Sequence, residues 1–223
     1  MTKKDNLVIV GSSGHARVVI DAIEKEGRFT IIGLIDKFRE IGEQEMSYPI
    51  LGAEEDLPRL IEQYGIGSVF VAIGDNHVRS AVASKIGDLC PELIFASVVH
   101  PNAEVASKVK IGEGTVLLSG VTVNPFAKIG RFCILNTNSS LDHDSELADF
   151  SSLAPNAVTG GNCNVGEGSA IGIGAVLIHG VTIGKHTVVG AGSLVLESVD
   201  DFVVAYGSPA KAISSRSEGD KYL

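Results

Sequence analysis

A histidine between two carboxylates is the residue whose setting in this chain best suits catalysis. His143 follows Asp142 and precedes Asp144. A carboxylate that accepts a hydrogen bond from one ring nitrogen fixes the tautomer and raises the basicity of the other nitrogen, as a general base requires. Gly161 follows eighteen residues later and His179 after eighteen more. In a structure that repeats every eighteen residues, both would stack on His143.

A glycine-rich loop near the start of the chain has the residues of an anion site. Gly11, Ser13, Gly14 and His15 separate an expected strand at 7–10 from an expected helix. Backbone N–H groups and the dipole at a helix N-terminus attract anions, and glycine lets a phosphate approach the backbone. The alternative is a tight turn that serves packing alone.

Other polar positions follow the next two expected strands. Asp36 comes after the strand at 29–35, while Gly74 and Asn76 come after the strand at 69–73. Ligands of open α/β sheets bind at the carboxyl ends of the strands. We therefore expect these residues and the glycine-rich loop to line one crevice that holds a nucleotide.

The elements that carry these residues alternate between strands and helices. Expected helices end at Gly27, Gly65 and Gly87, and this alternation predicts a small parallel sheet. Residues 1–98 therefore form an α/β Rossmann-like half domain, too short for a complete dinucleotide fold. We expect residues 37–52 to be a loop.

A six-residue pattern follows, from Val99 to Asp200. It returns 17 times without insertion, with an aliphatic residue first, except at Thr159, and a small residue fifth. A period of six fits neither an α-helix nor an alternating strand. It predicts an all-β domain over residues 99–200, a parallel β-helix of five to six coils with three hexads per coil. Residues 201–223 then form a C-terminal segment, and we expect the polar tail from Ser214 to be frayed.

Composition narrows the possible functions. The net charge of −9 argues against a nucleic-acid partner. No apolar run is long enough to cross a membrane, so we expect a cytoplasmic protein without membrane insertion. Cys133 and Cys163 occupy inward fifth positions and Cys90 ends an expected helix. None is an obvious nucleophile, which argues against transfer through an acyl-cysteine.

Three histidines of the repeat allow a metal site as an alternative. Two coils separate His143 from His179, roughly 10 Å at the usual strand spacing. Zinc binds nitrogens at about 2.1 Å, so one chain could not close a site that contains His143, His179 and His186. Ligands from two subunits could, as in β-helix hydrolases with zinc at the subunit interface.

The motifs in their order resemble a known family. They are the GxxGH loop, IDK, AIGDN with Arg79, HPNA, NTNSSLDHD within the hexapeptide repeat, and GSPAK at its end. This series is similar to the nucleotide-sugar N-acetyltransferases and sialic-acid O-acetyltransferases of the left-handed β-helix superfamily, and it covers nearly the whole chain. The resemblance implies a left-handed coil and a homotrimer with active sites between subunits.

The resemblance also implies roles for individual residues of the transfer site. His143 is the general base and Asp144 supports it, although close relatives often carry the longer Glu there. Asn136 matches an active-site asparagine. Gly161 is expected to present its backbone N–H to the thioester carbonyl.

Further residues are implied to bind the two substrates. Gly14, His15 and Asp36 match positions that hold the sugar nucleotide. Lys211 is expected to contact coenzyme A phosphates. Position 191 is expected to be a cofactor-binding glycine, whereas the chain carries Ala191 there.

The implied reaction is acetyl transfer without a metal or a covalent intermediate. Acetyl-CoA would acetylate the 4-amino group of a nucleotide-linked 4-amino-4,6-dideoxyhexose, a step of polysaccharide or O-antigen synthesis. Three alternatives are O-acetylation of a sialic-acid-type sugar, a zinc hydrolase and a scaffold without catalysis. The sequence does not distinguish UDP, dTDP and GDP.

Overall fold

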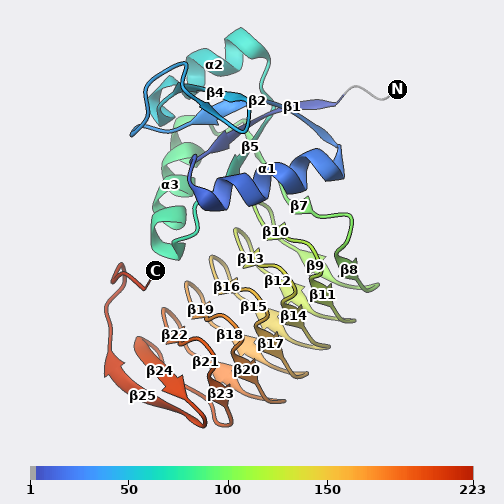
Figure 1. The fold of residues 1–223 in the computed structure, drawn as a ribbon, viewed down its shortest axis with the longest axis vertical. Coiled ribbons are helices and arrows are strands. Elements are labelled where there is room, and N and C mark those ends of the chain that lie inside the picture. Colours follow the sequence, from blue (N-terminus) through green and yellow to red (C-terminus); the bar gives the residue numbers. More distant parts are fainter. Residues whose placement is uncertain (1–3, 223) are drawn as a thin grey trace.

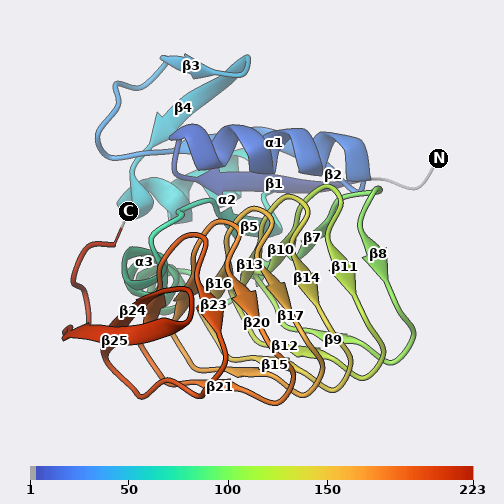
Figure 2. The same cartoon turned by 60° about the horizontal axis from the view of Figure 1, so that its bottom comes forward.

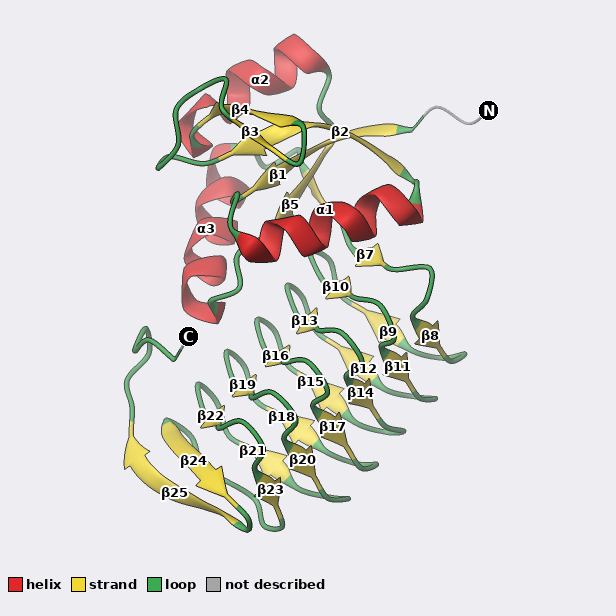
Figure 3. Cartoon of the chain, in the orientation of Figure 1, coloured by secondary structure: helices red, strands yellow, loops and turns green. Residues whose placement is uncertain are grey.

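The structure is a computed structural model that describes residues 4–222. An α/β unit precedes a coil of short parallel strands (Figures 1 and 3). The sheet of the α/β unit has the order β3-β4-β2-β1-β5-β6, in which only β3 and β4 pair antiparallel. Its strands are β1 (Asp5–Val10), β2 (Phe29–Ile35), β3 (Gln44–Glu45), β4 (Tyr48–Gly52), β5 (Ser68–Val71) and β6 (Ile94–Phe95).

Helices cover both faces of this sheet. They are α1 (Gly14–Glu26), α2 (Leu57–Tyr64) and α3 (Asn76–Leu89), with a short 3-10 helix η1 (Glu54–Asp56) before α2. Alternate β1 residues point to opposite faces, so Leu7 packs with α1, whereas Val8 packs with α2 and α3. The expected glycine stops are confirmed at Gly27 and Gly65, which adopt left-handed backbone with φ of 74° and 61°. The third helix does not end at Gly87, because α3 continues to Leu89.

The loop expected over residues 37–52 is only partly a loop. Its second half forms a hairpin of β3 and β4, whose turn residues Met46 and Ser47 both have positive φ. Neither residue type favours that conformation, so the sequence carries no turn signal there. β4 also pairs with β2, and this contact holds the hairpin on the sheet.

The hexad register is confirmed as a β-helix with three walls (Figure 2). The first wall contains β7 (Val98–Val99), β10 (Val116–Leu117), β13 (Ile134–Leu135), β16 (Ser152–Leu153), β19 (Ala170–Ile171), β22 (Val188–Val189), β24 (Val203–Gly207) and β25 (Ala210–Ser215). The second wall contains β8 (Glu104–Val105), β11 (Thr122–Val123), β14 (Ser140–Leu141), β17 (Val158–Thr159), β20 (Val176–Leu177) and β23 (Leu194–Val195). The third wall contains β9 (Lys110–Ile111), β12 (Lys128–Ile129), β15 (Glu146–Leu147), β18 (Asn164–Val165) and β21 (Thr182–Ile183).

The interior of the coil is filled as the repeat predicts. First-position residues such as Leu135 and Leu153 are fully buried, as are the fifth-position residues Cys133, Ala157 and Cys163. Burial raises the pKa of the Cys133 thiol to about 11, so this sulfur stays protonated at neutral pH. The inward placement of Cys133 and Cys163 is confirmed.

The coil does not stop at Asp200, and the tail is not frayed. β24 pairs in parallel with β22 and extends the first wall, and β25 folds back on β24. The chain then returns to α3, beside which the C-terminus lies in Figure 1. Arg216 donates a hydrogen bond to the carbonyl of His186 (2.7 Å), and the backbone N–H of Asn76 donates to the Tyr222 hydroxyl (3.0 Å). These polar contacts fix a segment whose composition suggested fraying.

Several contacts join the α/β unit to the coil, and two of them bury the face of α1 and the side chain of Arg79. The buried face of α1 packs on outward residues of the first wall, including Val116 and Ile134. On the other side, the guanidinium of Arg79 is 1% exposed. It donates to the carbonyls of Phe132, Phe150, Ile73 and Gly74 and to the Asn76 side chain. Burial lowers the pKa of Arg79 to about 10, so Arg79 is a cation at neutral pH that ties the loop after β5 to the coil. Within residues 4–222, no helix is long and apolar enough to span a membrane.

Candidate active site

A cavity of about 510 Å³ lies at the carboxyl ends of β1, β2 and β5, and we call it the N-terminal crevice. Five of the predicted residues line it, namely Gly11, Ser13, His15, Asp36 and Gly74. Gly14 is adjacent as the first residue of α1. The strand ends thus converge as the parallel sheet predicts.

Glycine is required at the start of this loop. Gly11 has a φ of 101°, and a Cβ atom there would lie 3.0 Å from the carbonyl oxygen of Ala72. Its N–H donates to the carbonyl of Ile35 (2.8 Å). The loop therefore bridges β2 and the segment after β5, and α1 begins two residues beyond Ser12 with no side-chain cap. The N–H groups of its first turn are available to an anion.

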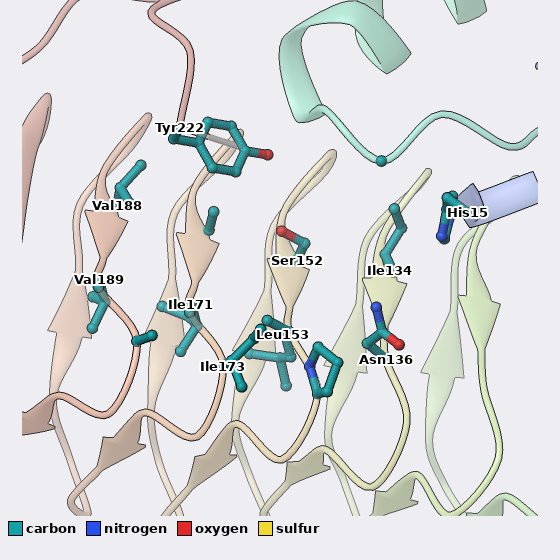
Figure 4. Close-up of a pocket in the computed structure, with 17 residues that line it drawn as sticks. His15, Ile134, Asn136, Ser152, Leu153, Ile171, Ile173, Val188, Val189 and Tyr222 are labelled. Atoms are coloured by element: carbon teal, nitrogen blue, oxygen red, sulfur yellow. The ribbon is translucent and has the colours of Figure 1, made fainter. Parts of the chain in front are cut away.

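A second cavity of about 390 Å³ runs along the first wall, and we call it the coil groove (Figure 4). Asn136 lies at one end, and the floor continues over the turns that contain Pro155, Ile173 and Ala191. His15 and Gly74 line both the groove and the N-terminal crevice. A ligand seated in the crevice can therefore extend past His15 to the coil.

His15 occupies this junction as a neutral imidazole. Burial, and then the charge of Arg79, lower its pKa to about 4. Its Nε2 atom is buried, and no residue from 4 to 222 provides it with a hydrogen-bond partner. A buried nitrogen without a partner is costly, so a ligand group that pairs with it gains affinity.

The ring of His143 is hydrogen-bonded to Asp144, the residue that we expect to support it. Nδ1 of His143 lies 2.9 Å from Oδ2 of Asp144, so the shorter Asp side chain does reach the ring. This hydrogen bond, followed in effect by the nearby charges of Asp142 and Asp144, raises the pKa of His143 above 6.5. Asp142 accepts from the Asn124 side chain (2.5 Å) and from the His143 N–H (2.8 Å), and these bonds hold the turn. Nε2 of His143 is thereby left as the basic atom.

Gly161 lies directly above this ring. A Cβ atom at Gly161 would collide with Nε2 of His143, so only glycine leaves the ring in place. Within the described residues, the Gly161 N–H donates to no acceptor. The eighteen-residue spacing thus places the backbone of Gly161, a residue with a free N–H, against the His143 ring.

The coil separates two groups of predicted residues. Asn136 follows β13, at the corner between the first and second walls, whereas His143 follows β14, at the corner between the second and third walls. The coil groove lies at the first of these corners. One chain therefore does not bring His143 to the groove.

Three other residues that were predicted to bind the cofactor or the substrate do not lie together. Ala191 lines the groove. Lys211 is exposed on β25 and lines neither cavity. Asn76 is buried and donates to the carbonyls of Gly168 and Ser169, so it joins α3 to the coil rather than facing the crevice.

Sequence reasoning missed several lining residues. Ala154, Gly172 and Gly190 follow Asn136 at intervals of eighteen and line the groove, so the repeat register could have identified them. Tyr222 also lines the groove, and Glu54 lines the crevice. No local motif indicates either residue, because long-range packing brings them there.

The histidines of the repeat do not form a metal site within one chain. The rings of His143 and His179 lie 6.3 Å apart between centroids. That is closer than two coil spacings, because Gly161 between them has no side chain. Across residues 4–222, no three His, Cys, Asp or Glu side chains gather in a way that could hold a metal ion.

Family models match both parts of the chain. The PglD N-terminal domain matches residues 6–86, and the bacterial transferase hexapeptide of six repeats matches residues 162–197. The UDP-N-acetylbacillosamine N-acetyltransferase of Bacillus subtilis (strain 168) is 36% identical over 117 residues. That match spans 51% of this chain and 51% of that protein, so the chain aligns with about half the length of this curated relative.

Solved structures match nearly the whole chain. PerB from Caulobacter crescentus, in complex with CoA and GDP-perosamine, is 36% identical with a TM-score of 0.88, over 96% of this chain and 99% of that chain. The acetyltransferase domain of PglB from Neisseria gonorrhoeae, in complex with acetyl coenzyme A, is 27% identical with a TM-score of 0.86, over 95% and 100%. These similarities extend across both the α/β unit and the coil.

Proposed function

Because this chain belongs to the sugar N-acetyltransferases of the left-handed β-helix family, we propose that it acetylates a nucleotide-linked 4-amino-4,6-dideoxyhexose at its 4-amino group. The acetyl donor is acetyl-CoA. The observation that carries this proposal is the arrangement of His143, with Nδ1 bound to Asp144 and Nε2 against the backbone of Gly161, whose N–H has no acceptor among the described residues.

This arrangement suits direct transfer. An amino sugar is mostly protonated at neutral pH, so nitrogen must lose a proton to attack a thioester. Nε2 of His143 accepts that proton, and the charge on the ring is stabilised by Asp144. The Gly161 N–H is a donor for the oxyanion that develops as the amine adds. As the oxyanion collapses, the carbon–sulfur bond breaks, and the CoA thiolate takes the proton held by His143 and leaves as free CoA. Cys133 and Cys163 face the core, so no thiol of the coil takes part.

The coil groove fits the pantetheine arm of acetyl-CoA. Its walls are apolar, with Ile134, Ile173 and Val188 among them. Among the described residues, the N–H groups of Ile173 and Ala191 have no acceptor, and they match the amide carbonyls of such an arm. Lys211 lies farther along the chain on β25 and is proposed to pair with a phosphate of the nucleotide end.

The site is proposed to form between subunits of a homotrimer. His143 and the groove lie at different corners of one coil, so the base of one subunit must meet the crevice and groove of its neighbour. A threefold axis parallel to the coil would place one corner against the next. Residues 1–98 then bind the sugar nucleotide and residues 99–200 carry the transfer, and we propose that the protein acts in the cytoplasm.

The proposal is tested by acetyl-CoA turnover against a panel of nucleotide-linked 4-amino sugars, with sialic acid and 4-hydroxy analogues as comparisons. We expect CoA release with at least one amino sugar and none with its hydroxyl analogue. The His143→Ala variant should lose at least about 10²-fold in kcat. Turnover of a hydroxyl substrate alone would replace N-acetylation with O-acetylation.

A further inference from the structure

Three carboxylates line the N-terminal crevice, and two of them accept backbone N–H groups. Asp36 accepts from the Ser12 hydroxyl (2.5 Å) and the Phe38 N–H (2.9 Å). Asp75 caps α3 by accepting from the Val78 N–H (2.9 Å). Glu54 differs, because its partner within residues 4–222 is a side chain, the Lys85 ammonium, which lies 3.2 Å from Oε2.

The free oxygen of Glu54 belongs to a buried side chain. Glu54 is 5% exposed and still lines the crevice, and within residues 4–222 no donor bonds to its Oε1 atom. A carboxylate is acceptor-only, so an oxygen without a protein donor can accept from a ligand that fills the crevice. Glu54 is therefore built to receive an N–H or O–H group from whatever fills the crevice.

The order of the strands in the sheet indicates which part of a bound nucleotide sugar would lie beside Glu54. The sheet order is β4-β2-β1-β5 across this edge. The loop after β1 and the start of α1 suit the diphosphate, and His15 and Gly74 lead toward the groove and the transfer site. Glu54 follows β4, two strands away from β1 on the side opposite β5. The sugar and the nucleobase extend from the diphosphate in opposite directions. Because the sugar must reach the transfer site on the β5 side, the nucleobase lies on the β4 side, beside Glu54.

An exposed aromatic residue supports this placement. Phe38 is 87% exposed although it lines the crevice, and Val78 and Val82 provide further apolar lining. A flat base can stack on such a ring, and stacking is favourable for any base because every base has a π-face. Phe38 thus provides affinity for a base, and Glu54 is left to select which one.

We propose that Glu54 selects guanine, so that the substrate is a GDP-linked amino sugar. This inference rests on the proposed function and specifies its nucleotide. The Watson–Crick edge of guanine presents two adjacent donors, N1–H and the N2 amino group, to which a carboxylate can bind. Uracil and thymine present a single N3–H between two carbonyl oxygens, and a buried carboxylate repels those oxygens.

The test compares GDP-, UDP- and dTDP-linked forms of one amino sugar, and the binding of free GDP, UDP and dTDP by calorimetry. The wild-type protein should favour GDP by at least about tenfold in both measurements, the change expected for one hydrogen-bonding pair of about 1.4 kcal/mol. Glu54→Gln should lose most of this preference. Glu55→Gln is the matched control, because Glu55 is 66% exposed, bonds to the same Lys85 and does not line the crevice; it should keep the preference.

The two readouts separate this inference from the proposed function. If GDP binds selectively and this selectivity depends on Glu54, but no acetyl transfer occurs, the proposed guanine site is supported and the proposed acetyltransferase activity is wrong. Equal binding of all three nucleotides, binding of none, or a preference unchanged in Glu54→Gln would overturn the base site. The preference is a ratio within each variant, so partial unfolding does not mimic its loss. Glu54→Asp, which keeps the charge but shortens its reach, should also reduce it.

Discussion

The imidazole of His143 and the backbone of Gly161 are in contact across one coil of the β-helix, because Gly161 has no Cβ atom. This contact brings the basic nitrogen against a residue whose N–H has no acceptor among the described residues. It also explains why position 161 requires glycine, although the φ of Gly161 is not in the left-handed region.

The first prediction concerns this contact. In Gly161→Ala the added methyl group meets the far end of the His143 side chain, which can rotate away, so the fold should persist while the base is displaced. We expect kcat to fall at least about 10²-fold, as for loss of a general base, with little change in the melting temperature. Steady-state kinetics and thermal unfolding provide the measurements. Gly87→Ala is the control, since its Cβ would meet nothing within 4 Å; full activity in Gly161→Ala would mean that the contact has no catalytic importance.

The second prediction concerns pH. His143 must be neutral to accept a proton, and its pKa is raised above 6.5 chiefly by the hydrogen bond to Asp144. Activity should therefore be present above this raised pKa and should fall as pH decreases through it. Asp144→Asn removes the carboxylate and should move the acidic limb of kcat/KM to lower pH. The amine of the substrate titrates identically with both enzymes, so the shift between the two profiles reports on the protein; coincident profiles would exclude Asp144 from this role.

The third prediction tests the site between subunits. His143→Ala and His15→Ala should each be nearly inactive, because they damage opposite halves of the site. Mixed trimers of the two should regain about one quarter of the wild-type activity, the fraction of interfaces with two intact halves in a random mixture. Activity is measured after co-expression with two affinity tags. If the hybrid trimers are as inactive as the two parent variants, His143 and His15 act in a site formed by a single subunit, and the prediction is wrong.

The fourth prediction concerns the joint formed by Arg79. Arg79→Met leaves several buried carbonyl oxygens without a donor, so we expect a loss of at least about 2 kcal/mol in the free energy of unfolding. Arg79→Lys should not restore it, because an ammonium has fewer donors and lacks the planar geometry. Denaturant unfolding measures both. Arg59→Met is the control, since Arg59 is exposed and its ion pair is at the surface; an equal loss in that variant would contradict a specific role for Arg79.

The sequence by itself determined the features that depend on local periodicity. The hexad register predicted the three walls, the inward cysteines and the stacking of Gly161 on His143, because residues eighteen apart must be neighbours in a triangular coil. One local feature was missed. Each fourth position from Lys108 to Gly192 has positive φ, and Phe126, Phe132 and Phe150 do not suggest it, because packing at the corners overrides their backbone preference.

Tertiary structure alone decided how the parts meet. The neutral state of His15, the joining role of Asn76, the return of the tail to α3 and the position of Glu54 all depend on contacts between segments far apart in sequence. The packing of α1 on the first wall and the hydrogen bonds of Arg79 set those contacts. The sequence therefore predicted the contact between His143 and Gly161 within the repeat, while the separation of His143 from the groove became visible only when the corners of the coil were in place.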